Sequence, residues 1–195
     1  MIVSANCWSQ STDVSFKLKH AEDVHVELFR MYVSNISLEF SDGTHFSEAN
    51  SYHLLDREQP NSLGFSIEHG TEKSVVAINM TIGTDSLINV SGALDGDLDP
   101  IKGMYWAWNT GYINFKLEGT KDKKAISYHV GGYANPHPTA RAIRFNIKKT
   151  KSINFLIDLD KFISSALSKE LVDVMIPGEE ATFLADTYKG IIGIE

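Results

Sequence analysis

The chain has 195 residues, of which 43% are hydrophobic and 22% charged, and its formal net charge is −7. This length fits one large domain with a sizeable core, and the composition is that of an ordinary globular protein. The net negative charge disfavours a nucleic-acid partner, because phosphates would be repelled over most of the surface. The single cysteine, Cys7, excludes an intrachain disulfide, so no disulfide pattern indicates the compartment.

Residues 1–10, MIVSANCWSQ, end in small and polar residues before charged, alternating sequence begins. We interpret them as an N-terminal tail, either the remnant of an export signal or a simple tail with a free thiol. A lipoprotein anchor at Cys7 is the weaker alternative, because Asn6 is a poor residue before a lipidated cysteine. Residues 11–195 then form one domain. No stretch approaches the ~20 apolar residues that span a bilayer, so we expect no membrane span.

The chain from residue 14 to residue 82 has mostly the period of strands. The expected strands are 14–18, two extended stretches within 24–40, then 51–55, 63–67 and 74–82. Asp42-Gly43 predicts a hairpin turn, because this pair supports positive φ.

The second half continues in the same way, with further strands expected at 113–117, 125–130, 142–148 and 152–158. Helices are expected at 158–167 and 178–190, the second beginning with a proline and two acids that suit the helix dipole. We take both helices for terminal additions. Many short strands separated by turn residues predict an all-β protein, a single-domain antiparallel β-sandwich with short C-terminal helices.

The segment 95–119 is the most distinctive part of the sequence, with two tryptophans and two tyrosines between Tyr105 and Tyr112. If this stretch is extended, Trp106 and Trp108 point to the same face. Such aromatic clusters are usually core. The preceding acidic turn, 95–100, is expected to cap and aim the tryptophan segment. Calcium binding there is a weaker alternative, because the later bidentate glutamate of a calcium loop is missing.

Motifs of the common enzyme classes are absent from the sequence. It has no nucleophile elbow, phosphate loop, dinucleotide fingerprint or zinc motif of the His-Glu-x-x-His or paired-cysteine type. We therefore expect a protein that is not an enzyme. Of the seven histidines, His20, His53 and His129 lie in or beside predicted strands. Taken singly, each is best interpreted as a hydrogen-bonded core or rim imidazole.

The run GALDGDLDPIKGMYWAWNTGYINFKLEG (92–119) resembles the signature of the MbnP family, copper proteins found beside methanobactin operons, which carry a Trp-x-Trp motif. Further matching stretches are FRMYVSNISL (29–38), SYHLLD (51–56), TIGTDSLINVSG (81–92), YHVGGY (128–133) and PGEEATFLADTY (177–188). The resemblance extends from about residue 16 almost to the C-terminus, and its central motif is long and specific.

The resemblance implies a periplasmic or exported copper(I)-binding protein. Its site would depend on oxidation of the first motif tryptophan, Trp106, to kynurenine by a partner, a diheme cytochrome c peroxidase or MauG-type protein. Trp108 is the second member of the motif. Ring opening would give an aryl amine, and imidazole is a suitable companion ligand for copper. On motif position, His53 and His129 are expected to be the imidazole ligands, with His20 in reserve.

The alternative is a β-sandwich binding module without metal. In it Trp106 and Trp108, with the two neighbouring tyrosines, would form an aromatic platform for a sugar or a peptide. Exposure separates the two hypotheses: a platform needs open indole faces, whereas a metal site buries Trp106 near imidazoles.

Overall fold

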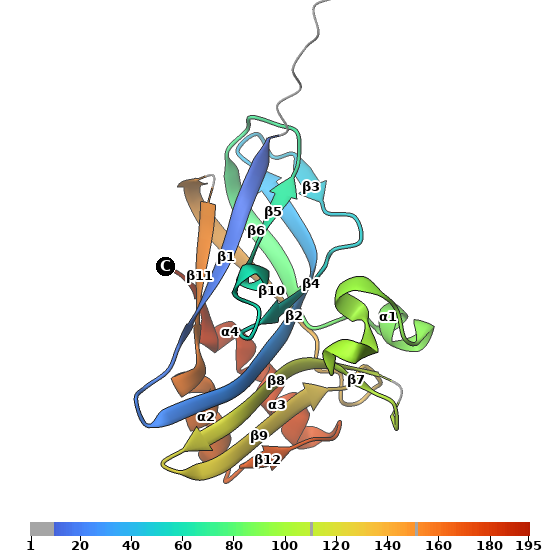
Figure 1. Ribbon diagram of the computed structural model, residues 1–195. Coiled ribbons are helices and arrows are strands. Elements are labelled where there is room, and N and C mark those ends of the chain that lie inside the picture. Colours follow the sequence, from blue (N-terminus) through green and yellow to red (C-terminus); the bar gives the residue numbers. More distant parts are fainter. Residues whose placement is uncertain (1–9, 110, 151) are drawn as a thin grey trace, which may run out of the picture.

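The computed structural model describes residues 10–109, 111–150 and 152–195, and the expected tail with Cys7 lies almost wholly outside these ranges. Two sheets face each other around the main core (Figure 1). The smaller sheet has the strand order β13-β11-β1-β5. Its strands are β1 (Ser11–Lys19), β5 (Gly64–Glu68), β11 (Ser152–Asp158) and β13 (Ile192–Ile194).

The larger sheet has the order β10-β6-β2-β8-β9-β12. Its strands are β2 (Val24–Phe40), β6 (Val75–Ile82), β8 (Gly111–Lys121), β9 (Lys124–Gly131), β10 (Arg141–Thr150) and β12 (Asp173–Val174). Short strands β3 (His45–Ser47) and β4 (Tyr52–Asp56) pair with β2, and β7 (Tyr105–Trp106) pairs with β8. The predicted all-β sandwich is confirmed. Most pairs are antiparallel, but β1 with β11 and β9 with β12 are parallel.

Strand β2 is one strand of 17 residues, where the sequence suggested two extended stretches. The pairing register shifts between Ser34 and Ser37, and Asn35 there has a φ of 51°. Such a bulge bends a strand without ending it. Residues 24–31 of β2 therefore pair with β8, while residues 33–40 pair with β6. The interruption in the sequence pattern marks this bulge and not a loop.

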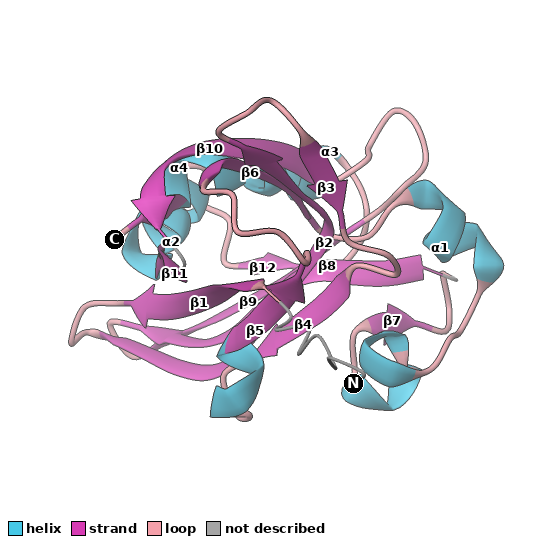
Figure 2. Ribbon diagram, turned by 90° about the horizontal axis from the view of Figure 1, so that it is seen from above, coloured by secondary structure: helices cyan, strands magenta, loops and turns pink. Residues whose placement is uncertain are grey.

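Three C-terminal helices close the main core: α2 (Leu159–Leu167), α3 (Glu179–Asp186) and α4 (Tyr188–Ile191) (Figure 2). The ring of Phe115 in β8 lies 4.4 Å from that of Phe162 and 5.5 Å from that of Tyr188, measured between centroids. These helices are core elements, so their interpretation as terminal additions was wrong. The helix expected at 178–190 is divided in two at Thr187. None of the described helices is long and apolar enough to cross a membrane.

The outer face of the large sheet carries a second, smaller core. Along β2, Met31 and Val33 point into the main core, so Arg30 and Tyr32, which alternate with them, point to the outer face. The second cluster consists of Tyr32, Leu54, Leu98, Met104, Trp106, Tyr112 and Ile113. Met104 is thus buried in apolar packing. The tryptophan segment therefore lies over the outer face of the sheet, outside the main core.

The segment that covers this second core contains helix α1 (Ser86–Ser91), the 3-10 turns η2 (Gly96–Leu98) and η3 (Pro100–Lys102), and β7. Figures 1 and 2 show α1 and β7 together at one end of the molecule. Asp97 holds the segment to the sheet: its carboxylate accepts from the Leu54 N–H at 3.0 Å and from Lys102 Nζ at 2.6 Å. The Asp97 carbonyl accepts from the Tyr32 hydroxyl at 2.8 Å. The acidic turn thus positions the tryptophan hairpin.

Candidate functional site

Trp106 is buried against the end of strand β9. It is 6% exposed and pairs with Gly111 in the β7–β8 hairpin. A Cβ added to Gly131 would lie 2.7 Å from Trp106 Cζ3 and 2.7 Å from the Tyr112 carbonyl oxygen. The absent side chain at Gly131 therefore makes the space in which the six-membered ring of the indole lies.

Trp108 is the open member of the pair, with 64% of its surface exposed. Strand β7 ends at Trp106, and Trp108 lies in the turn that follows. The two rings are 5.6 Å apart between centroids and inclined at 46°, so the turn brings the indoles into contact. One indole is therefore buried and the other open, which corresponds partly to each of the two sequence hypotheses.

His129 lies on the same face of β9 as the Trp106 contact. It comes two residues before Gly131, and side chains two apart on a strand point to one face. It is 7% exposed, and its Nε2 lies 2.6 Å from Glu118 Oε1. Because a carboxylate accepts, Nε2 carries the proton and donates, and Nδ1 has the free lone pair. A carboxylate that fixes an imidazole in this way is a common outer partner of a metal-bound histidine.

The ionisation of this pair favours a neutral imidazole. Burial lowers the pKa of His129, and the hydrogen bond with Glu118 opposes that shift only in part. Burial alone would raise the pKa of Glu118, but the hydrogen bond from His129 and the charge of Lys116 hold it below its ordinary value. At neutral pH the site thus presents an uncharged imidazole beside an ionised carboxylate. The neutral imidazole is the form that coordinates a metal.

His53 lies on the opposite face of the same sheet. It pairs with Val33, which faces the main core, whereas His129 pairs with Lys116, itself opposite Arg30 of the outer face. Its Nε2 is 2.8 Å from Glu48 Oε2, and its ring stacks on Phe65 with centroids 3.8 Å apart. The structure therefore does not bring His53 and His129 together, contrary to the expectation that they share an ion.

His20 lies in the exposed connection between β1 and β2, where its Nδ1 is 3.3 Å from the Ala21 carbonyl oxygen. In both Figures 1 and 2 this connection is on the far side of the molecule from β7. The connection that contains His20 is therefore not beside the tryptophan hairpin. Within the described ranges, no three His, Cys, Asp or Glu side chains are grouped as a metal ion would need.

The histidine that the structure adds to this region is His137. It lines a pocket of ≈ 410 Å³ together with Trp108, Tyr133 and Ile176. Its carbonyl oxygen lies 2.9 Å from the position that a Cβ on Gly132 would take. No role for His137 could be predicted from the sequence, because it stands between two prolines in a loop. The sequence feature that indicates this contact is the adjacent pair Gly131-Gly132, because glycine allows another segment of the chain to pack closely against it.

Gly131→Ala should displace Trp106 and destabilise the fold by about 1–3 kcal/mol, the usual cost of overpacking. The added methyl would meet both the indole and a backbone carbonyl, and the latter cannot rotate away. Chemical denaturation followed by tryptophan fluorescence would measure both effects. Gly190→Ala is the matched control, because a Cβ there meets nothing within 4 Å and the residue is helical. Equal stability of the two variants would contradict the packing argument.

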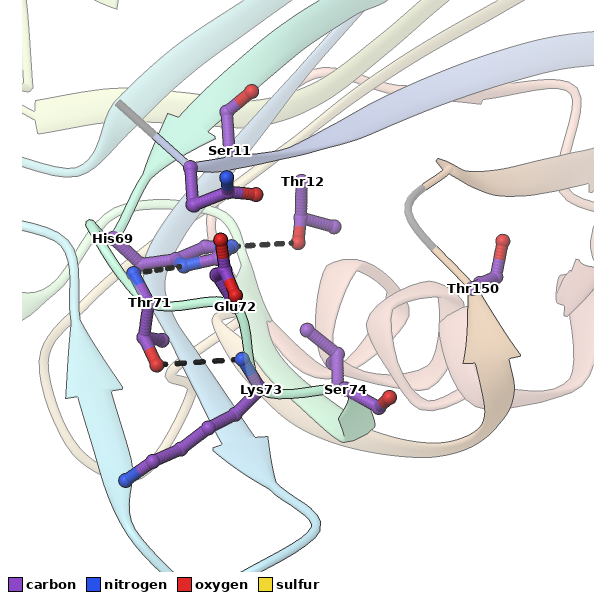
Figure 3. A pocket seen from close by; sticks show the side chains of 10 residues that line it. Ser11, Thr12, His69, Thr71, Glu72, Lys73, Ser74 and Thr150 are labelled. Carbon is purple, nitrogen blue, oxygen red and sulfur yellow. Dashed lines mark hydrogen bonds between the residues drawn. The ribbon is translucent and has the colours of Figure 1, made fainter. Parts of the chain in front are cut away.

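A separate pocket of ≈ 170 Å³ lies where β1 begins, lined by Thr12, His69, Thr71 and Lys73 among others (Figure 3). His69 Nδ1 accepts from the Thr71 N–H at 3.3 Å, and Nε2 is 3.0 Å from Thr12 Oγ1. The His69 ring also meets Phe40 edge-on at 5.2 Å. This pocket contains none of the residues predicted from the tryptophan motif, and its contacts serve to fix the 69–74 turn.

Burial lowers the pKa of His69, and this gives a pH dependence with a definite sign. The unfolded chain takes up a proton near pH 6.5 while the folded imidazole is still neutral. Stability should therefore fall as the pH decreases below about 6.5 and be unaffected by this group above it. His69→Gln should flatten that part of the profile of unfolding free energy against pH. An NMR titration of His69 at or above the ordinary histidine value would contradict the prediction.

The fold and the β7–β8 hairpin define a class of protein: a two-sheet β-sandwich with a buried and an exposed tryptophan at one end of the larger sheet. The chain belongs to the MbnP family, whose sequence model matches residues 5–176. Among solved structures it is similar to MbnP from Methylosinus trichosporium, with a TM-score of 0.59 and 16% identity over 80% of this chain and 78% of that one. At this identity the likeness shows the fold alone. A comparison with curated proteins finds no match.

Proposed function

We propose that the protein binds copper(I) at the end of β9, in a site completed by oxidation of Trp106 to kynurenine. The observation that supports this most is the position of Trp106 over Gly131, on the same face of β9 as His129. An intact indole offers an N–H donor and no lone pair to a metal. Opening the ring would supply an amine and a carbonyl on the face of β9 that also carries the His129 imidazole.

The residues present fit a low-coordinate copper site in part. His129 has a free Nδ1 lone pair and a carboxylate partner at Nε2. His137 is a further imidazole near the hairpin, since it lines the same pocket as Trp108. Imidazole suits copper, and the few oxygen ligands here disfavour magnesium and calcium. The proposed donors are therefore the amine formed from Trp106 and the imidazoles of His129 and His137. We propose no catalytic turnover at this site; the protein would act as a carrier or store of copper.

The oxidation requires a partner with strongly oxidising equivalents, and a diheme cytochrome c peroxidase or MauG-type protein is the partner we propose. Both proteins would work in the periplasm or another exported location. The net charge of −7 and the apolar surface around Trp108 suit contact with another protein better than contact with nucleic acid.

A second candidate function is retained because one observation favours it. Trp108 is open and, with Tyr133 and two asparagines, lines a pocket large enough for a small ligand. Aromatic faces with nearby amides are suited to sugars or peptides. In this alternative the protein is a binding module without metal.

Copper(I) titration in competition with a chromophoric chelator separates the two. The chain would be titrated as isolated and again after oxidation by the diheme partner, with the modification at Trp106 verified by peptide mass mapping. Tight binding confined to the oxidised form supports the copper site. Equal affinity of both forms would remove kynurenine from the mechanism and leave the binding module as the stronger hypothesis.

A further inference from the structure

We infer that Trp108 is an electron relay, through which an external one-electron oxidant acts on the buried Trp106. This inference rests on the proposed function, since it concerns the oxidation that the copper site requires. It adds a role for the second tryptophan of the motif, which the copper chemistry itself does not need.

Access is the first observation. Trp106 is 6% exposed, and its six-membered ring fills the space over Gly131. A protein cofactor, or any oxidant larger than a few atoms, cannot lie against this ring. Trp108 is 64% exposed, and its ring is 5.6 Å from that of Trp106. An electron leaving Trp106 therefore has a second oxidisable indole in contact with it, and that indole reaches the surface.

The surface around Trp108 is the second observation. Apart from Ile194, the exposed large apolar side chains among the described residues all belong to 87–108 and 172–176. Trp108 and Ile176, one from each segment, line the same pocket, and the described residues lining it include no Asp, Glu, Lys or Arg. An oxidant can thus approach the Trp108 ring without removing a charged side chain from water. A contact of limited area is typical of transient electron-transfer encounters.

The oxidant takes one electron from Trp108, the resulting radical cation takes one electron from Trp106, and the oxidised Trp106 indole loses its N–H proton to water. Complete conversion of Trp106 to kynurenine consumes three waters and releases formic acid, four protons and four electrons. Four such one-electron transfers are therefore needed, and a high-potential metal-centre oxidant accepts the electrons. Trp108 is restored after each transfer and is not consumed.

The test uses photogenerated tris(bipyridine)ruthenium(III), a bulky one-electron oxidant, on the full chain. The rate of modification at Trp106 is followed by peptide mass mapping in the parent, Trp108→Phe, Trp108→Tyr and Ile101→Ala. Trp108→Phe keeps an aromatic ring of lower electron-donating ability, so modification of Trp106 should slow at least about tenfold, equivalent to about 1.4 kcal/mol of barrier. Trp108→Tyr, which keeps an oxidisable ring, should recover much of the rate.

Ile101→Ala is the matched control, because Ile101 is 87% exposed on the same covering segment and has no redox chemistry. It should leave the rate unchanged, and circular dichroism would verify that all variants are folded. Equal rates in the parent and Trp108→Phe would overturn the relay while leaving the copper proposal intact. Conversely, relayed oxidation of Trp106 without any gain in copper affinity would refute the proposed function and leave the relay standing.

Discussion

Copper(I) affinity should rise at least about 100-fold when Trp106 is oxidised, since even an outer-shell partner of a metal site is worth ~10–100-fold. The reason is the conversion of an indole without an available lone pair into an amine that coordinates. Trp106→Phe cannot form this amine, so the variant should show only the weak affinity of the unmodified chain. Competition titration measures both forms directly.

Trp108→Phe is the matched control for this prediction, because it also removes one indole of the Trp-x-Trp motif. Exposed to oxidant long enough for full modification at Trp106, it should show the same rise in copper affinity as the parent. A Trp106→Phe variant that gains affinity after oxidation would place the modified residue elsewhere in the chain. A Trp108→Phe variant that is fully modified but does not gain would make Trp108 part of the metal site.

The architecture could be predicted from the sequence because it depends on local alternation. Strands such as β1 and β11 mostly bury every second residue, and the turn at Asp42-Gly43 follows from the preference of this pair for positive φ. The helices were placed correctly but given the wrong role. An amphipathic pattern shows that a helix has a buried face, and it does not show whether that face completes the main core, as Phe162 does.

The site was only partly predictable, for a reason of sheet geometry. The sequence identified Trp106 and His129 from their motifs, and the structure brings both to one face of β9. His53 and His129 were expected to share one ion, but they lie on opposite faces of the sheet. The face on which a residue lies depends on the strand register, and a shift of one residue reverses it. The burial of Trp106 beside an open Trp108 depends on a turn after β7 that no periodicity indicates.

A comparison of His129→Ala with His53→Ala tests which face of the larger sheet carries the copper site. Removing His129 should lower the copper(I) affinity of the oxidised protein about 100-fold or more, as expected for the loss of a direct ligand where an outer-shell partner is worth ~10–100-fold. Removing His53 should leave that affinity within about threefold, because sites on opposite faces without shared partners act independently.

The two variants are well matched, because Nε2 of each histidine donates to one glutamate: His129 to Glu118 and His53 to Glu48. Each substitution removes one such hydrogen bond. Thermal unfolding should therefore be measured on both, so that a loss of copper binding is not confused with a loss of fold. Glu118→Gln adds a graded step: it keeps the shape but weakens the hold on His129 Nε2, and should cost roughly tenfold in affinity. If His53→Ala weakens copper binding as much as His129→Ala does, the donors are not on the outer face, and the site beside Gly131 is wrong.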